Sequence, residues 1–164
     1  MGASAWHYIV PFQPDIQAAL DTLRQKEFAA WKQAHPRKRY KSIDALLKAV
    51  GADGTSSILD VNHISTTPLP SAKRGFSHYN FRDPKDMARF MAAMNEHIGK
   101  VFPLSSEDYL TLFGTTRPTR LDIEQASSAL AILYDRLERD SGIYLILYQN
   151  DIPTEIYFMG ISGD

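Results

Sequence analysis

The sequence has no cysteine among its 164 residues. A disulfide framework, a thiolate nucleophile and a cysteine-ligated metal site are therefore excluded. The five histidines lie far apart, and no two have the i, i+3 or i+4 spacing that would place them on one face of a helix. They are His7, His35, His63, His78 and His97. We predict no metal site and no cofactor.

Long apolar runs are also absent. No run approaches the roughly 20 residues that a membrane-spanning helix needs. The first ten residues, MGASAWHYIV, have neither a basic start nor a long apolar stretch, so they do not have the pattern of a signal peptide. We therefore expect a cytoplasmic protein that has no membrane association.

The common local motifs of enzymes and cofactor-binding proteins are missing as well: GxxxxGK[ST], GxGxxG, HExxH, GxSxG and the EF-hand loop. The net charge is only −1, which is less positive than is usual for nonspecific nucleic-acid binding. The charge is nevertheless divided. Residues 1–100 contain 14 Lys and Arg and 9 Asp and Glu, whereas residues 101–164 contain 4 and 10. Such a division suits electrostatic steering toward a partner.

The length and the apolar content indicate an ordinary globular protein. A chain of 164 residues with 44% hydrophobic residues is the natural size of one domain with a core of its own. We predict a single α+β domain over residues 1–164. Its small, mostly antiparallel sheet is expected to combine an N-terminal strand, a mid-chain strand and a C-terminal hairpin, packed by about five helices.

Periodicity and capping residues place these elements. AWHYIVPF reads as the N-terminal strand, TSSILDVNHIS as the mid-chain strand, and the two apolar runs on either side of Pro153 as the hairpin. Helices are expected over Pro14 to about Ala34, Ser42–Gly51, Asp83–Gly99, Ser105–Gly114 and Thr119 to about Arg139. Residues 65–84 contain four helix-breaking residues and no periodicity, so they are expected to form a long loop. Loops of this length tend to be functional or mobile.

The 65–84 loop contains the strongest candidate binding residues. The stretch SAKRGFSHYNFRDP carries charge between aromatic rings, and its candidates are Lys73, Arg74, His78, Tyr79 and Arg82. Arginine and lysine would attract an anion or an acidic partner, and the rings could stack on a planar group. Against this interpretation, Asp83 and Asp86 would repel an anion at the start of the next helix. The aromatic rings could equally anchor the loop to the core.

Three residues are the candidates if the protein is an enzyme. Glu27 falls in the apolar stripe of its helix, where an unpaired carboxylate would cost several kcal/mol or would gain a shifted pKa. Asp60 and His63 lie three residues apart, so a regular strand would point them to opposite faces. A structural role fits all three better. Even so, His63, Asp60 and Glu27 are the acid–base groups to test.

A stripe of apolar residues marks the helix after Asp83: Met87, Phe90, Met91, Met94 and Ile98. Methionine adapts to varied partners, so the stripe could form a pliable binding groove. Its regular helical spacing favours a core-facing stripe instead.

Three functional hypotheses follow. The first, which the sequence favours over catalysis, is a small non-catalytic binding protein with a protein partner, of the inhibitor or immunity type that covers its target. The second is an enzyme or small-ligand binder with a cleft between the sheet and the 65–84 loop. The third is a nucleic-acid binder that uses residues 37–41 and 73–82 on one face.

Overall fold

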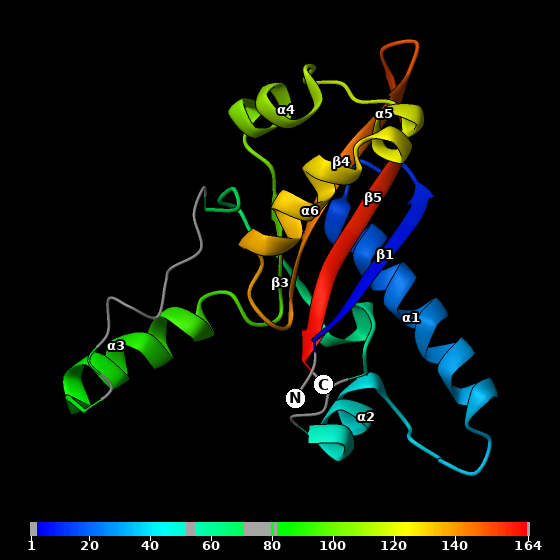
Figure 1. The fold of residues 1–164 in the computed structure, drawn as a ribbon. Coiled ribbons are helices and arrows are strands. Elements are labelled where there is room, and N and C mark those ends of the chain that lie inside the picture. The colour runs from blue at the N-terminus through cyan, green and yellow to red at the C-terminus, as the bar shows by residue number, and fades with distance from the viewer. Residues whose placement is uncertain (1–2, 52–54, 71–79, 81, 164) are drawn as a thin grey trace.

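The computed structural model describes residues 3–51, 55–70, 80 and 82–163. The chain order of its elements is β1 (Ala3–Pro11), α1 (Ile16–Ala34), α2 (Ile43–Val50), the 3-10 helix η2 (Ile58–Asp60), β2 (His63–Ile64), α3 (Pro84–Asn95), β3 (Lys100–Pro103), α4 (Ser106–Phe113), α5 (Arg120–Gln125), α6 (Ser127–Arg136), β4 (Ser141–Gln149) and β5 (Ile152–Gly163). The predicted α+β class is confirmed, and Figure 1 shows the arrangement.

The five strands form one sheet in the order β1-β5-β4-β3-β2. The long pairs β1–β5 and β4–β5 are antiparallel, while the short pairs β3–β4 and β2–β3 are parallel. The sheet is therefore mixed, and most of its pairing is antiparallel, as predicted. The C-terminal hairpin lies inside the sheet with the N-terminal strand beside it, which is also as predicted.

Helices cover both faces of the sheet. Leu20 and Leu23 of α1 pack with Ile156 and Phe158 of β5 on one face. On the other face, Leu133 of α6 packs in a cluster with alternate residues of β4 and β5 and with side chains of α4 and α5. Because residues of β5 alternate between these two clusters, both faces of this strand are buried.

Trp6 of β1 is held against two glycines. Its side chain is 5% exposed, and Gly160 and Gly142 are cross-strand partners next to it in the sheet. A Cβ atom at Gly142 would lie 2.8 Å from the indole ring, and a Cβ atom at Gly160 would overlap it. The ring can therefore lie flat on the sheet only because neither position has a side chain.

The predicted mid-chain strand over TSSILDVNHIS is wrong for most of its length. The chain forms η2 and then only the two-residue strand β2. The Asp60 carboxylate accepts hydrogen bonds from the Thr55 N–H at 2.9 and 3.0 Å and from the Thr55 hydroxyl at 2.8 Å. The Leu59 N–H donates to the Ser57 hydroxyl. These side-chain bonds to the backbone favour a turn over a ladder.

Two further differences concern residues 100–139. The helix predicted over Thr119–Arg139 is two helices, because the chain leaves helical geometry at Ala126, with φ −94° and ψ 37°. The short strand β3 was not predicted. It has only four residues, of which Val101 and Phe102 are buried, so it carries too little periodicity to be recognised.

The prediction that the methionine stripe faces the core is also wrong. Met87 and Met91 of α3 are 39% and 51% exposed, and Ile98 just after the helix is 43% exposed. Helix α3 extends away from the sheet (Figure 1). Periodicity identifies which side of a helix is apolar, but it does not determine what covers that side.

Adding one methyl group at Gly160 tests the packing of the Trp6 ring against the sheet. We expect Gly160→Ala to lower the free energy of unfolding by about 3 kcal/mol, because its Cβ would meet the indole and lie 2.6 Å from the Ser141 carbonyl oxygen. Gly114→Ala is the control, since nothing lies within 4 Å of its Cβ position. Its φ of 70° should cost only about 1 kcal/mol. Chemical denaturation measures both, and equal losses would contradict the proposed packing.

Candidate functional site

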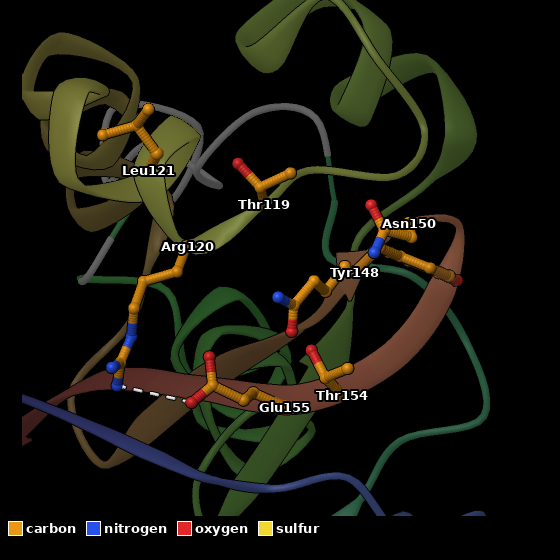
Figure 2. A pocket seen from close by; sticks show the side chains of 8 residues that line it. Thr119, Arg120, Leu121, Tyr148, Asn150, Thr154 and Glu155 are labelled. Carbon is orange, nitrogen blue, oxygen red and sulfur yellow. Dashed lines mark ion pairs between the residues drawn. The ribbon is translucent and has the colours of Figure 1, made fainter.

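A hollow opens where α5 meets the turn of the β4–β5 hairpin, and we call it the hairpin pocket. Its volume is about 640 Å³. Its lining is Thr119, Arg120, Leu121, Tyr148, Gln149, Asn150, Thr154 and Glu155. Figure 2 shows Arg120 reaching from α5 toward Glu155 on β5, with Thr119 on one side and Thr154 on the other. The pocket therefore offers hydroxyl, amide and charged groups from two separate segments.

Local sequence fixes both walls of the hairpin pocket. Asn150 and Asp151 form the hairpin turn with φ angles of 51° and 63°, a conformation that these two residue types tolerate better than most. On the other wall, Thr119 and Asp122 form a capping box that starts α5. The hydrogen bonds from Thr119 hold the pKa of Asp122 below its usual value. The Tyr148 N–H donates to the Pro118 carbonyl at 2.9 Å, which joins the two walls.

Two ion pairs lie at this end of the molecule. Arg120 Nη2 is 3.4 Å from Glu155 Oε1, and Arg117 Nη1 is 3.0 Å from Asp151 Oδ1. The Arg117 guanidinium also lies 6.0 Å from the centre of the Tyr148 ring. Arg117, Arg120 and Asp151 are more than half exposed, and Glu155 is 29% exposed. Such pairs contribute little to stability, so the two arginines remain available to a ligand or partner.

Large apolar side chains project at the same end. Ile152 at the start of β5 is 64% exposed, and Leu121 on the pocket wall is 59% exposed. These are the two highest values among the large hydrophobic residues that the structure describes. A single exposed leucine is ordinary, but two beside a polar hollow are a feature of binding surfaces.

A second hollow, the strand pocket, adjoins the first and shares Arg120 with it. Its volume is about 390 Å³. It is lined by His7 and Ile9 of β1, Tyr157 of β5, and Arg120, Ile123, Glu124, Ser127, Leu130 and Tyr134 of α5 and α6. The rings of His7 and Tyr157 are stacked with centroids 5.8 Å apart. Burial, and to a smaller extent the neighbouring Tyr134, raise the pKa of Tyr157 to about 12.

The predicted acid–base residues lie elsewhere, on the side of the sheet that α1 covers. Glu27 accepts a hydrogen bond from the Tyr8 hydroxyl at 3.1 Å. The carboxylate in the apolar stripe therefore has a hydrogen-bond partner that carries no charge. Burial, followed by the Glu27 charge and more weakly by Asp60, raises the pKa of Tyr8 to about 12. The structure thus brings Glu27 and Asp60 near Tyr8, while His63 is exposed on β2. Their assignment as catalytic groups stays a prediction.

Four of the predicted binding residues, Lys73, Arg74, His78 and Tyr79, lie outside the described residues. Arg82 is described: it is exposed in the turn before α3, and its N–H donates to the Asn80 side chain at 3.2 Å. The basic loop therefore stays a prediction. In the other basic stretch, residues 37–41, the ring of Tyr40 packs near Trp31 with centroids 5.6 Å apart, while the four basic side chains are exposed.

A third hollow, the loop pocket, lies between β3 and the beginning of the predicted 65–84 loop. Its volume is about 320 Å³, and it is lined by Ser65, Thr67, Pro68, Pro70, Glu96, His97, Lys100 and Phe102. The second functional hypothesis placed a cleft in this region, with His63 or His78 meeting Glu27 or Asp60. His78 lies outside the described residues, and none of the other three lines the loop pocket. The carboxylate and the histidine that line this pocket are instead Glu96 and His97.

Arg136 fixes the wall of the loop pocket. Its guanidinium donates to the carbonyls of Leu69 and Pro70 at 2.9 to 3.2 Å, and it pairs with Asp108 at 2.7 Å. The side chains of Arg136 and Asp108 are only 10% and 15% exposed. Burial would raise the pKa of Asp108, but hydrogen bonds from Arg136 and Ser105 outweigh it and hold this pKa below its usual value.

Sequence reasoning missed the hairpin pocket. Its individual residues are ordinary surface types, and none belongs to a recognised motif. Two local signals were present: the T-x-x-D capping pattern at Thr119 and the Asn150-Asp151 pair between apolar runs. The first predicts the start of a helix and the second predicts a turn. Neither predicts that the start of this helix lies against this turn in the fold.

The Asp108–Arg136 pair gives stability a defined pH dependence. Because the folded pKa of Asp108 is below its unfolded value, its contribution is present above the unfolded pKa and is lost as the pH falls through the folded one. We expect Asp108→Asn to lower the free energy of unfolding at pH 7 by about 3 kcal/mol. Between pH 5 and pH 2, the free energy of unfolding of this variant should fall by less than that of the wild type. Denaturant titrations across this range measure both effects.

Asp135→Asn is the matched control, since Asp135 is exposed on the same helix as Arg136. The free energy of unfolding of this control variant should depend on pH as that of the wild type does. If Asp108→Asn showed the same dependence, the buried ion pair would not be the source of the acid sensitivity.

No described helix is both long enough and apolar enough to cross a membrane. Within the described residues, no three His, Asp or Glu side chains gather closely enough to hold a metal ion. No protein family, curated protein or solved structure matches this chain. We therefore infer its function from the geometry of its own side chains.

Proposed function

We propose that this chain is a small non-catalytic protein that binds a partner protein, in the manner of an inhibitor or immunity protein that covers its target. The observation that carries the proposal is the hairpin pocket together with two exposed apolar side chains, Leu121 on its wall and Ile152 in the adjoining start of β5. A side chain of the partner would enter the hollow, while Leu121 and Ile152 would be buried against the surrounding partner surface. A few residues near the centre of an interface supply most of its binding energy, and removing apolar side chains from water there contributes to it.

The residue types at this end support a protein partner. Tyrosine and arginine are, with tryptophan, enriched at the energetic centres of interfaces, and Tyr148, Arg117 and Arg120 lie here together. Both arginines form exposed ion pairs with carboxylates, so a partner can replace these contacts at little cost.

The charges at this end indicate the character of the partner. Four acidic side chains, Asp122, Glu124, Asp151 and Glu155, lie near two basic ones, Arg117 and Arg120. The excess of acidic groups favours a partner whose matching surface is basic. Complementary charge at the rim mainly speeds association, and added salt weakens this effect.

The positions of the candidate acid–base groups support binding rather than catalysis. Glu27 bonds to Tyr8, and Asp60 closes the turn at Thr55. Both belong to the side of the sheet that α1 covers, and neither lines the hairpin pocket or the strand pocket. Their hydrogen bonds give each carboxylate a structural role.

One observation favours a second candidate function, a small-ligand binder. The loop pocket places Glu96 and His97 beside Lys100 in a hollow of about 320 Å³, close to where that hypothesis expected a cleft. The nucleic-acid hypothesis needs residues 37–41 and 73–82 on one face. Most of the second stretch lies outside the described residues, so that hypothesis stays a prediction.

Photo-crosslinking followed by titration tests the proposed protein-binding surface. A photoreactive amino acid at position 121 or 152 should crosslink one partner in the source cells, whereas the same group at Ile132 should not. Ile132 is a suitable control because it is 49% exposed but lies on α6.

Titration of the purified partner then measures the energetics. We expect Leu121→Asp and Ile152→Asp each to raise Kd by at least about tenfold, which corresponds to about 1.4 kcal/mol. Ile132→Asp should change Kd by less than about twofold. Thermal melts should show that all three variants remain folded. Unchanged affinity of both pocket variants would reject the hairpin pocket as the binding surface.

A further inference from the structure

No described strand pairs with the outer side of β1. Strand β1 lies at one end of the strand order and pairs only with β5; in Figure 1 no labelled strand lies beyond it. Just past its end, the Phe12 N–H donates to the Thr154 carbonyl at 2.9 Å, in the same register. Even-numbered residues of β1 therefore direct their backbone groups toward β5. Odd-numbered residues direct theirs outward.

The outward backbone groups belong to Ala5, His7 and Ile9 in the middle of the strand. None of these groups has a hydrogen-bond partner among the residues that the structure describes. Ala5 and His7 are also exposed. This edge can therefore accept another strand without first breaking an existing backbone bond.

The sequence of β1 does little to protect this edge. Natural edge strands are commonly short or carry charged residues, which discourage pairing with another chain. The nine residues of β1, ASAWHYIVP, contain no Lys, Arg, Asp or Glu. Pro11 is the only residue of β1 without a backbone N–H, and it lies at the last position of the strand. The edge is long, neutral and blocked only at its end.

We propose that β1 pairs antiparallel with β1 of a second copy of this chain, around a two-fold axis at His7. In this register His7 lies opposite the second copy's His7, and Ala5 lies opposite the second copy's Ile9. Every outward N–H and carbonyl of these three residues then has a partner. The two five-stranded sheets join into one continuous sheet. The pairing is isologous, as closed dimers require.

The residues of β1 favour a second copy over an unrelated strand. The register matches itself on both faces. On one face the small Ala5 meets the β-branched Ile9 of the second copy, a pair that fits without crowding. On the other face Trp6 is opposite the second copy's Tyr8 in register, but its buried ring lies over β5 and away from this edge, so it adds no bulk between the two strands. Because β1 has no charged side chain, two copies meet without like-charge repulsion. This inference does not depend on the hairpin pocket.

Substitutions of opposite charge at His7 test whether β1 pairs with β1 of a second copy and whether His7 lies opposite His7. We expect sedimentation equilibrium of the wild type to give a mass approaching twice 18.5 kDa at high protein concentration, falling on dilution. His7→Lys alone and His7→Glu alone should each remain at the monomer mass, since like charges would lie directly opposite each other. An equimolar mixture of the two variants should recover the dimer. Ile132→Lys, an exposed site on α6, should behave like the wild type.

Amide hydrogen exchange provides a measurement that needs no variant. In the wild type, exchange at Ala5, His7 and Ile9 should slow by at least about tenfold between dilute and concentrated samples. The inward amides of Trp6 and Tyr8 should change little, because β5 already bonds them. A wild type that stays monomeric at millimolar concentration would overturn the proposal. Variants with Lys or Glu at position 7 that still dimerise alone would overturn it as well, because another surface would then hold the two copies together.

Discussion

The contact of Trp6 with Gly142 and Gly160 is the constraint on which the sheet depends. The indole lies across β5 and reaches β4, so one side chain spans the three longest strands. Its buried ring also joins the cluster that receives Leu20 and Leu23 of α1. The two glycines give up side-chain packing of their own, and the large buried surface of the tryptophan replaces it. Trp6 and α1 therefore meet in one buried cluster on this face of the sheet.

Polar side chains shape the parts of the chain that strands and helices leave irregular. Asp60 closes the turn before β2, and Arg136 holds the carbonyls of Leu69 and Pro70 against α6. In both places a side chain provides the hydrogen bonds that a sheet would otherwise have provided. Buried backbone groups need such partners. These bonds allow the parallel half of the sheet to be built from very short strands, β2 and β3.

The elements that could be predicted from the sequence have strong local signals. Ser42, Ser105 and Thr119 cap helices as expected, and the C-terminal hairpin follows its turn residues. The exposure of Met87 and Met91 could not be predicted, because an apolar stripe looks the same whether or not another element covers it. The hairpin pocket could not be predicted either. It depends on Tyr148 meeting Pro118 across the fold, and this contact is tertiary.

The pairing of β1 with β5 joins the two ends of the described chain, from Ala3 with Gly163 to Pro11 with Glu155. Within residues 3–163, β1 is synthesised before the other elements and its partner β5 after them. Until then, Trp6 lacks both glycines on which its ring lies, and α1 has no finished surface to pack against. Contacts between such distant residues also slow folding, because a long loop must close before they form. Among these elements the sheet is therefore completed last, and the uncharged β1 has no β5 to pair with until residues 152–163 have been made.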